Sequence, residues 1–167
     1  MHDTVIKLLD EVKQLWMATD SLKAFTDWPH DLIASNRAPN PAPAAEKIMA
    51  WRPPENSETS PLVHAVQQAA FHVNWQFIYT EEEVGRHFLD NYAYFELIGP
   101  TGHFRSDQCC AFIGYWGRVY FTLRIITRPK NSILYLLVTR YLSQTATALP
   151  HLARPRTAFM PAINPMP

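Results

Sequence analysis

The stretch from Tyr92 to Arg118 constrains the fold more than any other part of the chain. It is dense in aromatic and β-branched residues, and the turn-forming run Gly99-Pro100-Thr101-Gly102 interrupts it. This pattern predicts a strand, a turn and a second strand that runs from Cys109 to Trp116. The chain therefore builds a sheet here, and the rest of the fold has to cover it.

The residues before these strands predict a helical layer. Apolar residues recur at helical spacing from Val5 to Trp16, with Asp3 as a helix cap, and Ser21–Phe25 can continue the helix. A proline-rich connector occupies residues 34–43, and a short helix is expected over Ala44–Trp51.

Two further helix starts follow. Ser60-Pro61 predicts a helix whose apolar face extends over Leu62–Tyr79. Thr80 and Glu83 match a capping box, which predicts another helix that runs toward Asn91. The acidic run at 81–83 is therefore interpreted as a helix start and not as a pair of catalytic carboxylates.

The isolated histidines and cysteines predict no catalytic centre. His64 and His72 lie two helical turns apart, too far to share a metal without a third element, and are interpreted as partly buried or interface residues. Cys109 and Cys110 are adjacent, which is a poor basis for a disulfide, so they are interpreted as structural.

Composition limits the classes of partner. The net charge of the 167 residues is zero, which gives no electrostatic reason to expect nucleic acid or an anionic membrane. No apolar run approaches the roughly 20 residues that span a bilayer. The N-terminus lacks the hydrophobic region of a signal peptide, so we expect a cytoplasmic protein that binds neither nucleic acid nor membrane.

The run GPTGHFRSDQ, followed by AFIGYWGR, resembles the entry into the barrel of the dimethylsulfoniopropionate (DMSP) lyases, which are small metal-dependent cupins. The resemblance implies an α+β protein in which an N-terminal helical layer precedes a cupin-type β-barrel. It also implies a carbon–sulfur lyase that cleaves DMSP to dimethyl sulfide and acrylate. In that family, histidines and a glutamate hold a divalent metal such as Zn, Fe, Mn or Ni, and a tyrosine removes the proton α to the carboxylate.

The composition changes abruptly after Arg118. All fifteen acidic residues and all five glycines lie at or before Gly117, whereas the last 49 residues carry six Lys or Arg. A barrel uses glycine or asparagine at tight turns, and its metal site usually needs a carboxylate. We therefore divide the chain into a helical region at 1–91, the first barrel strands at 92–118, and an off-pattern tail at 119–167 with which the chain cannot complete the barrel.

A slip of the reading frame near Arg118 explains this change. Joining the last base of each codon to the first two of the next allows His-His-His-x-x-Glu-Glu-[Phe/Leu]-Tyr across residues 124–133, which resembles the metal motif of the family. The same frame allows His-Ala-Ser-Asn-Gln-Pro-His-Ala across 159–167 and resembles the segment with the later histidine ligand. Because that segment lies inside the family's domain, we expect the restored frame to continue beyond Pro167.

The chain as it stands carries few of the residues that the resemblance implies. It has no residue in a catalytic or metal-ligand position; His103 lies upstream of the metal motif and matches no ligand. We expect it to be inactive and to bind no metal. The aromatic walls that a sulfonium ion favours point to Tyr115 and Trp116 as substrate-binding residues, although on a strand one of them faces away. The oligomeric state stays open.

One alternative function belongs to another class, that of non-enzymatic proteins. If the tail is genuine, apolar residues between Ile133 and Leu142 could line an amphipathic helix. The protein would then be a non-enzymatic helical interaction or binding module with a basic tail.

Overall fold

The computed structural model describes residues 2–51, 59–117, 120–127 and 133–139. The helices are α1 (Asp3–Ala18), α2 (Asp20–Phe25), α3 (Pro43–Ala50), α4 (Ser60–Ala69), α5 (Glu81–Val84) and α6 (Arg86–Leu89). The strands are β1 (Ile33–Ala34), β2 (Tyr92–Ile98), β3 (Phe104–Arg105), β4 (Cys109–Trp116), β5 (Tyr120–Thr127) and β6 (Ile133–Thr139). Helices thus precede most of the strands, as the predicted α+β class requires.

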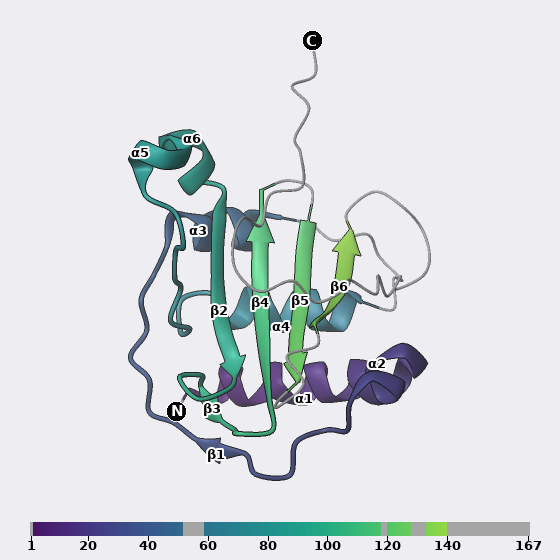
Figure 1. Cartoon of the computed structure of the whole chain (residues 1–167). Helices are drawn as coiled ribbons and strands as arrows, with labels where there is room; N and C mark the ends of the chain where they lie inside the picture. Colours follow the sequence, from purple (N-terminus) through teal and green to yellow (C-terminus); the bar gives the residue numbers. More distant parts are fainter. Residues whose placement is uncertain (1, 52–58, 118–119, 128–132, 140–167) are drawn as a thin grey trace.

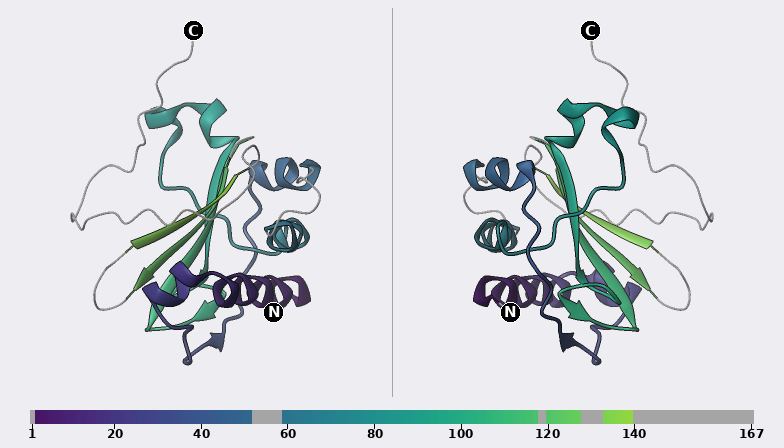
Figure 2. Two further views of the ribbon diagram at one scale, coloured as in Figure 1. Left: turned by 90° about the vertical axis from the view of Figure 1, so that its right-hand side faces the viewer. Right: turned by 90° about the vertical axis from the view of Figure 1, so that its left-hand side faces the viewer.

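The described strands form one open sheet in the order β1-β3-β2-β4-β5-β6. Helices α1, α3 and α4 lie against one of its faces, which the two side views make plain (Figure 2). Strands β2, β4, β5 and β6 form an antiparallel meander. The short strands β1 and β3, which the sequence pattern did not predict, add an edge beside β2 (Figure 1).

The helical layer differs from the prediction in its boundaries. Helix α1 is capped by the side chain of His2 and not by Asp3, which is the first helical residue. The helix expected over Leu62–Tyr79 ends at Ala69. Residues 73–76 do not continue the helix, because their backbone groups form hydrogen bonds with those of Asn40 and Tyr94. This pairing ties the proline-rich connector to the sheet, and it overrides the helical periodicity.

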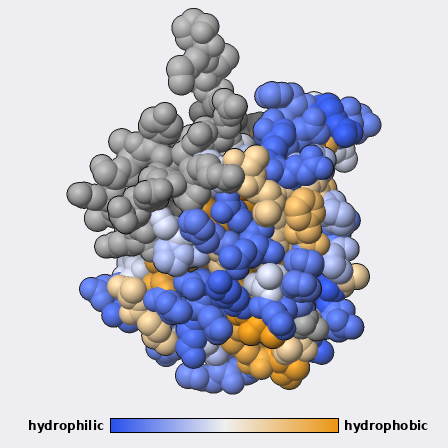
Figure 3. All heavy atoms as spheres, turned by 180° about the vertical axis from the view of Figure 1, so that it is seen from behind, coloured by the Kyte–Doolittle hydropathy of each residue, from blue (hydrophilic) through white to orange (hydrophobic). Residues whose placement is uncertain are grey.

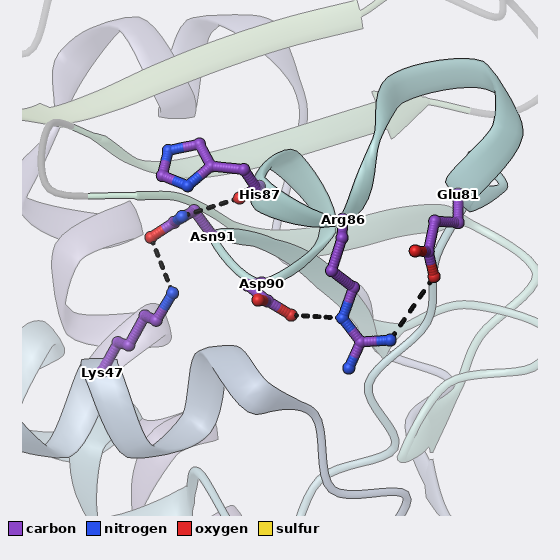
Figure 4. A network of polar contacts seen from close by, with 6 residues as sticks. All are labelled: Lys47, Glu81, Arg86, His87, Asp90 and Asn91. Carbon is purple, nitrogen blue, oxygen red and sulfur yellow. Dashed lines mark hydrogen bonds and ion pairs between the residues drawn. The ribbon is translucent and has the colours of Figure 1, made fainter.

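The capping box at Thr80 and Glu83 is confirmed, but the helix that it starts is short. Gly85, with φ of 77°, ends α5, and α6 begins at once with Arg86. The Arg86 guanidinium joins the two helices by ion pairs to Glu81 at 3.4 Å and to Asp90 at 3.0 Å (Figure 4).

The end of this helical pair is also tied to α3. The Asn91 side chain accepts a hydrogen bond from Lys47 and donates one to the His87 carbonyl (Figure 4). The start of β2 is therefore held against the helical layer by polar contacts at 2.8–3.0 Å.

The sheet extends beyond Arg118 into the segment predicted as an off-pattern tail, and that division of the chain stays a prediction. Strand β5 pairs with β4 along its whole length, and β6 pairs with β5. A helix over residues 133–142 is wrong, because 133–139 form β6. The run of β-branched and aromatic residues in both segments explains the pairing. The remainder of the predicted tail lies outside the described residues.

The core lies between the sheet and the helices. We call the face toward α1, α3 and α4 the helix-covered face; its buried strand residues are Ala93, Phe95, Ile113, Tyr115, Leu123 and Ile125. They pack with Leu8, Val12 and Trp16 of α1 and with the apolar side of α4. Seen from the helices, the outer surface is largely hydrophilic with scattered apolar areas (Figure 3). No helix in the described part of the chain is long and apolar enough to cross a bilayer.

Candidate functional site

The opposite face of the sheet carries a row of aromatic side chains. Successive residues of a strand alternate between the two faces, so residues that pair across the ladder share one face. Tyr92 pairs with Trp116, Glu96 pairs with Phe112, and Phe112 pairs with Arg124. We call this surface the aromatic face; it comprises Tyr92, Tyr94, Glu96, Phe112, Trp116 and Arg124.

The rings of the aromatic face form a continuous series. The ring of Tyr92 lies 4.7 Å from that of Trp116 and 6.4 Å from that of Tyr94, measured between centroids. Tyr94 lies 6.1 Å from Phe112, and the Arg124 guanidinium carbon lies 5.9 Å from the Phe112 centroid. These tilted arrangements lie within the range of favourable aromatic and cation–π contacts.

A carboxylate stands at one end of the row. Glu96 is 6% exposed, and its Oε2 accepts a hydrogen bond from the Thr101 hydroxyl. Gly99, with φ of 142°, makes room for it, because a Cβ at this position would lie 1.9 Å from Glu96 Oε1. The turn that the sequence predicts at 99–102 thus has a specific role in seating this carboxylate.

The two tyrosines of the row are held in the phenol form. Burial raises the pKa of Tyr92 well above its ordinary value, with smaller contributions from Tyr79 and Tyr94. Burial also raises the pKa of Tyr94, and the Glu96 charge adds to this effect while Arg124 opposes it. Electron-rich rings beside a carboxylate favour a cationic ligand, and neutral phenols suit binding rather than proton abstraction.

The two residues predicted to bind substrate separate between the faces. Tyr115 is 4% exposed and lies in the core on the helix-covered face. Trp116 is half-buried, points to the aromatic face and lies against Tyr92 and Phe88. The structure therefore leaves Trp116, and not Tyr115, beside the candidate site.

The other candidate residues lie elsewhere. His64 is exposed, and His72 stacks on His2 with the ring centroids 3.5 Å apart. His103 is 2% exposed, and its Nε2 accepts the Asn74 backbone N–H at 3.1 Å. Burial, together with the charge of Arg37, lowers the pKa of His103 to about 4, so the ring is neutral.

The cysteines are both buried and form no disulfide. Burial raises the pKa of the Cys109 thiol to about 12, with smaller contributions from Cys110 and Asp31. A thiol in this state is a poor nucleophile and a poor metal ligand.

The described residues do not fit the divalent metal expected of the family. Among them, no group of three or more His, Cys, Asp or Glu is arranged to hold a metal ion. On the aromatic face, Glu96 is the one carboxylate, and it lies on β2 beside aromatic rings.

Sequence reasoning missed Tyr94, Glu96 and Phe112 as site residues. The signal was available, since strict alternation places them on the same face as Trp116 once β2 and β4 are paired in register. What the sequence could not supply was that register, because the shift between Glu96 and Ile98 is a local irregularity of the ladder.

Fold and site together define a protein in which a helical layer covers one face of an open, largely antiparallel sheet and a row of aromatic side chains lies on the other. One solved structure, described as "Crystal structures of DMSP lyases RdDddP and RnDddQII", is 34% identical with a TM-score of 0.67 and covers 70% of this chain. The DMSP lyase DddQ from Ruegeria pomeroyi DSS-3 is 24% identical, with a TM-score of 0.65 over 71% of this chain, and supports the fold alone. No protein-family model and no curated protein matches.

The chain belongs to the DMSP lyase family, which confirms the resemblance of its sequence. It spans 60% of the length of each of these two structures.

Proposed function

We propose that this chain is a DMSP lyase family member that holds the substrate-facing wall of the site but not the catalytic groups. In the intact family member, loss of the proton α to the carboxylate of DMSP and departure of dimethyl sulfide from the β carbon give acrylate. The observation that carries this proposal is the match to solved DMSP lyases at 34% identity over 70% of the chain.

The aromatic face supports a role in binding the sulfonium group. A sulfonium ion is poorly hydrated and is attracted to the faces of electron-rich rings. Tyr94, Phe112 and Trp116 supply such rings from β2 and β4, and the buried Tyr92 packs against Trp116; all four lie upstream of Arg118. They are therefore the same residues in either reading frame, whereas Arg124 depends on the frame.

We further propose that the frame slips near Arg118 and that the present chain is inactive for this reason. The shifted frame allows the metal and base motifs that the family resemblance implies, and the present sequence does not contain them. Without them the reaction loses both the positioning of the substrate and the stabilisation of the developing charge. Each of these effects generally lowers the activation free energy by roughly several kcal/mol.

Dimethyl sulfide release measured by gas chromatography tests the functional proposal. Purified 1–167 is expected to release none above the rate in buffer, with or without added Zn²⁺, Fe²⁺, Mn²⁺ or Ni²⁺. The protein made from the frame-restored gene is expected to release dimethyl sulfide and to lose this activity with a chelator. A frame-restored, metal-loaded protein that is inert toward DMSP would overturn the assignment of DMSP as the substrate.

Sequencing the coding DNA through the codons for Gly117 to Thr122 tests the frame. An extra or missing base there would support the slip. An uninterrupted frame would favour the alternative, a non-enzymatic interaction module with a basic tail. Restoration that meets an early stop codon would likewise count against the slip.

A further inference from the structure

A cavity of about 280 Å³ lies away from the aromatic face. It is bounded by the start of α1, the connector after β1 and the chain after α4, and its lining is His2, Val5, Ser35, Asn36, Arg37, Pro39, His72 and His103. All of its charged or titratable lining groups are basic, and no carboxylate is among them.

Arg37 is the one residue in this lining that carries a permanent positive charge. Its Nε is buried and has no hydrogen-bond partner, and no ion pair to Arg37 occurs among the described residues. Arginine is suited to bind planar or tetrahedral oxyanions through two nitrogens, and this guanidinium has no carboxylate partner among the described residues. This geometry points to a ligand that accepts hydrogen bonds.

The histidines around Arg37 have defined tautomers. His2 Nδ1 accepts the Thr4 backbone N–H at 3.4 Å, which leaves the ring proton of the neutral form on Nε2. His103 Nε2 accepts the Asn74 N–H, which leaves its proton on Nδ1. Each ring therefore keeps one N–H donor, and His72 lies parallel to His2 at an interplanar angle of 8°.

Backbone hydrogen bonds hold the walls of the cavity in place. Ser35 N–H donates to the His103 carbonyl at 2.8 Å, and Asn40 N–H donates to the Val73 carbonyl at 3.1 Å. The Asn74 side chain donates to the Ala38 carbonyl at 3.0 Å. The connector is therefore fixed on both sides of Arg37, so a ligand would meet a preformed site rather than order a loop.

From this cavity we infer a binding site for a small oxyanion, a carboxylate or a phosphate, centred on Arg37. The size of the cavity limits the ligand to a few non-hydrogen atoms beyond the anionic group. The site lies within residues 2–103 and depends on neither the aromatic face nor the reading frame after Arg118.

Titration of the full chain with sodium phosphate and, separately, sodium acetate tests the site, with chloride at equal ionic strength as the reference. Backbone amide NMR shifts of Ser35, Asn36, Arg37 and His72 are expected to change and saturate together. Arg37→Gln is expected to weaken this binding by about tenfold or more, because a charge-assisted contact is lost. Arg105→Gln removes the same charge from an exposed residue outside the cavity and should leave binding within about twofold.

A second pair of variants keeps the test informative if Arg37→Gln does not fold. His72→Gln is expected to weaken binding, and His64→Gln, an exposed histidine of α4, is not. Saturation by phosphate alone or acetate alone identifies the anion. Equal shifts with chloride, shifts spread over the whole surface, or binding unchanged by both Arg37→Gln and His72→Gln would overturn the inference.

Discussion

The two faces of the sheet use similar residue types for different purposes. On the helix-covered face, Phe95 and Tyr115 lie in the core at 0% and 4% exposure. On the aromatic face, Phe112 and Trp116 of β4 are half-buried, whereas Tyr92 of β2 is 2% exposed. An aromatic side chain on β4 is thus structural or available for binding according to its register alone.

Polar groups follow the same division. The aromatic face carries Glu96 and Arg124 within reach of its rings, whereas the core cluster on the helix-covered face contains apolar side chains. Burial of a sheet face against helices excludes charges that lack partners, while a face outside the helical layer can retain them for recognition. The difference is the reason why we propose substrate binding on the aromatic face.

The largest test of this comparison removes a ring from each face. Phe95→Ala should lower the free energy of unfolding by about 3–5 kcal/mol, because it deletes a fully buried ring that contacts Trp75 at 4.8 Å. Phe112→Ala should cost about 1 kcal/mol, in proportion to its partial burial. Urea unfolding of both variants measures the difference; equal losses would mean that the aromatic face is part of the core.

The next test concerns the seat of Glu96. Gly99→Ala should cost about 1–3 kcal/mol from backbone strain alone, and more because the new Cβ meets the carboxylate. Gly85→Ala, at φ of 77° with no atom within 4 Å of the new Cβ, carries comparable strain without the clash. Adding Glu96→Ala should recover part of the Gly99→Ala loss and none of the Gly85→Ala loss. If Glu96→Ala recovers none of the stability lost in Gly99→Ala, the cost of that substitution does not come from contact with Glu96.

The element types could largely be predicted from the sequence. Strand β4 lies where predicted, the capping box forms at Thr80, and α1 ends before Asp20. These features are local, since capping hydrogen bonds and side-chain alternation need no distant partner.

The features that the sequence could not supply depend on tertiary contacts. The helix over Leu62–Tyr79 ends early because residues beyond Ala70 pair with Asn40 and Tyr94, which are distant along the chain. The two-residue strands β1 and β3 are too short to give a periodic signal. Residues 120–127 and 133–139 form β5 and β6 despite the altered composition, because apolar β-forming residues pair through the backbone regardless of the acidic and glycine content.

The candidate site could be predicted only in part. The sequence predicts Tyr115 and Trp116 as substrate-binding residues, and the structure places them on opposite faces, because the pattern gives alternation but not which face the helices cover. Substrate binding by either residue stays a prediction. The side chain of Arg37 gave no signal in the sequence. Its significance comes from the cavity that brings it together with His2, His72 and His103.

The helix-covered side also buries a titratable group, which gives a pH test. His103 has a folded-state pKa of about 4, below the ordinary 6.5, because of burial and the Arg37 charge. The unfolded chain therefore binds more protons than the folded chain between these two pH values. The free energy of unfolding keeps the full contribution of His103 above about pH 6.5 and decreases as the pH drops toward 4. The urea midpoint should decline across this window.

His103→Gln should flatten that decline, since glutamine can accept the Asn74 N–H without titrating. His64→Gln, which removes an exposed histidine, is the matched control and should leave the decline unchanged. A decline of the same slope in His103→Gln would assign the pH dependence to other groups.

The smallest expected effect lies within the aromatic row, where Phe88 of α6 contacts Trp116 with a ring separation of 6.4 Å. A double-mutant cycle of Trp116→Leu and Phe88→Leu should give a coupling of about 0.5–1 kcal/mol in the free energy of unfolding. The edge-on geometry, with an interplanar angle of 77°, predicts a favourable sign. Phe112 and Phe88, which share no ring contact among the described pairs, provide the control cycle with coupling near zero. A coupling at Phe88–Trp116 as large as those of core pairs would place Trp116 with the core, and the aromatic face would then lose its most accessible ring.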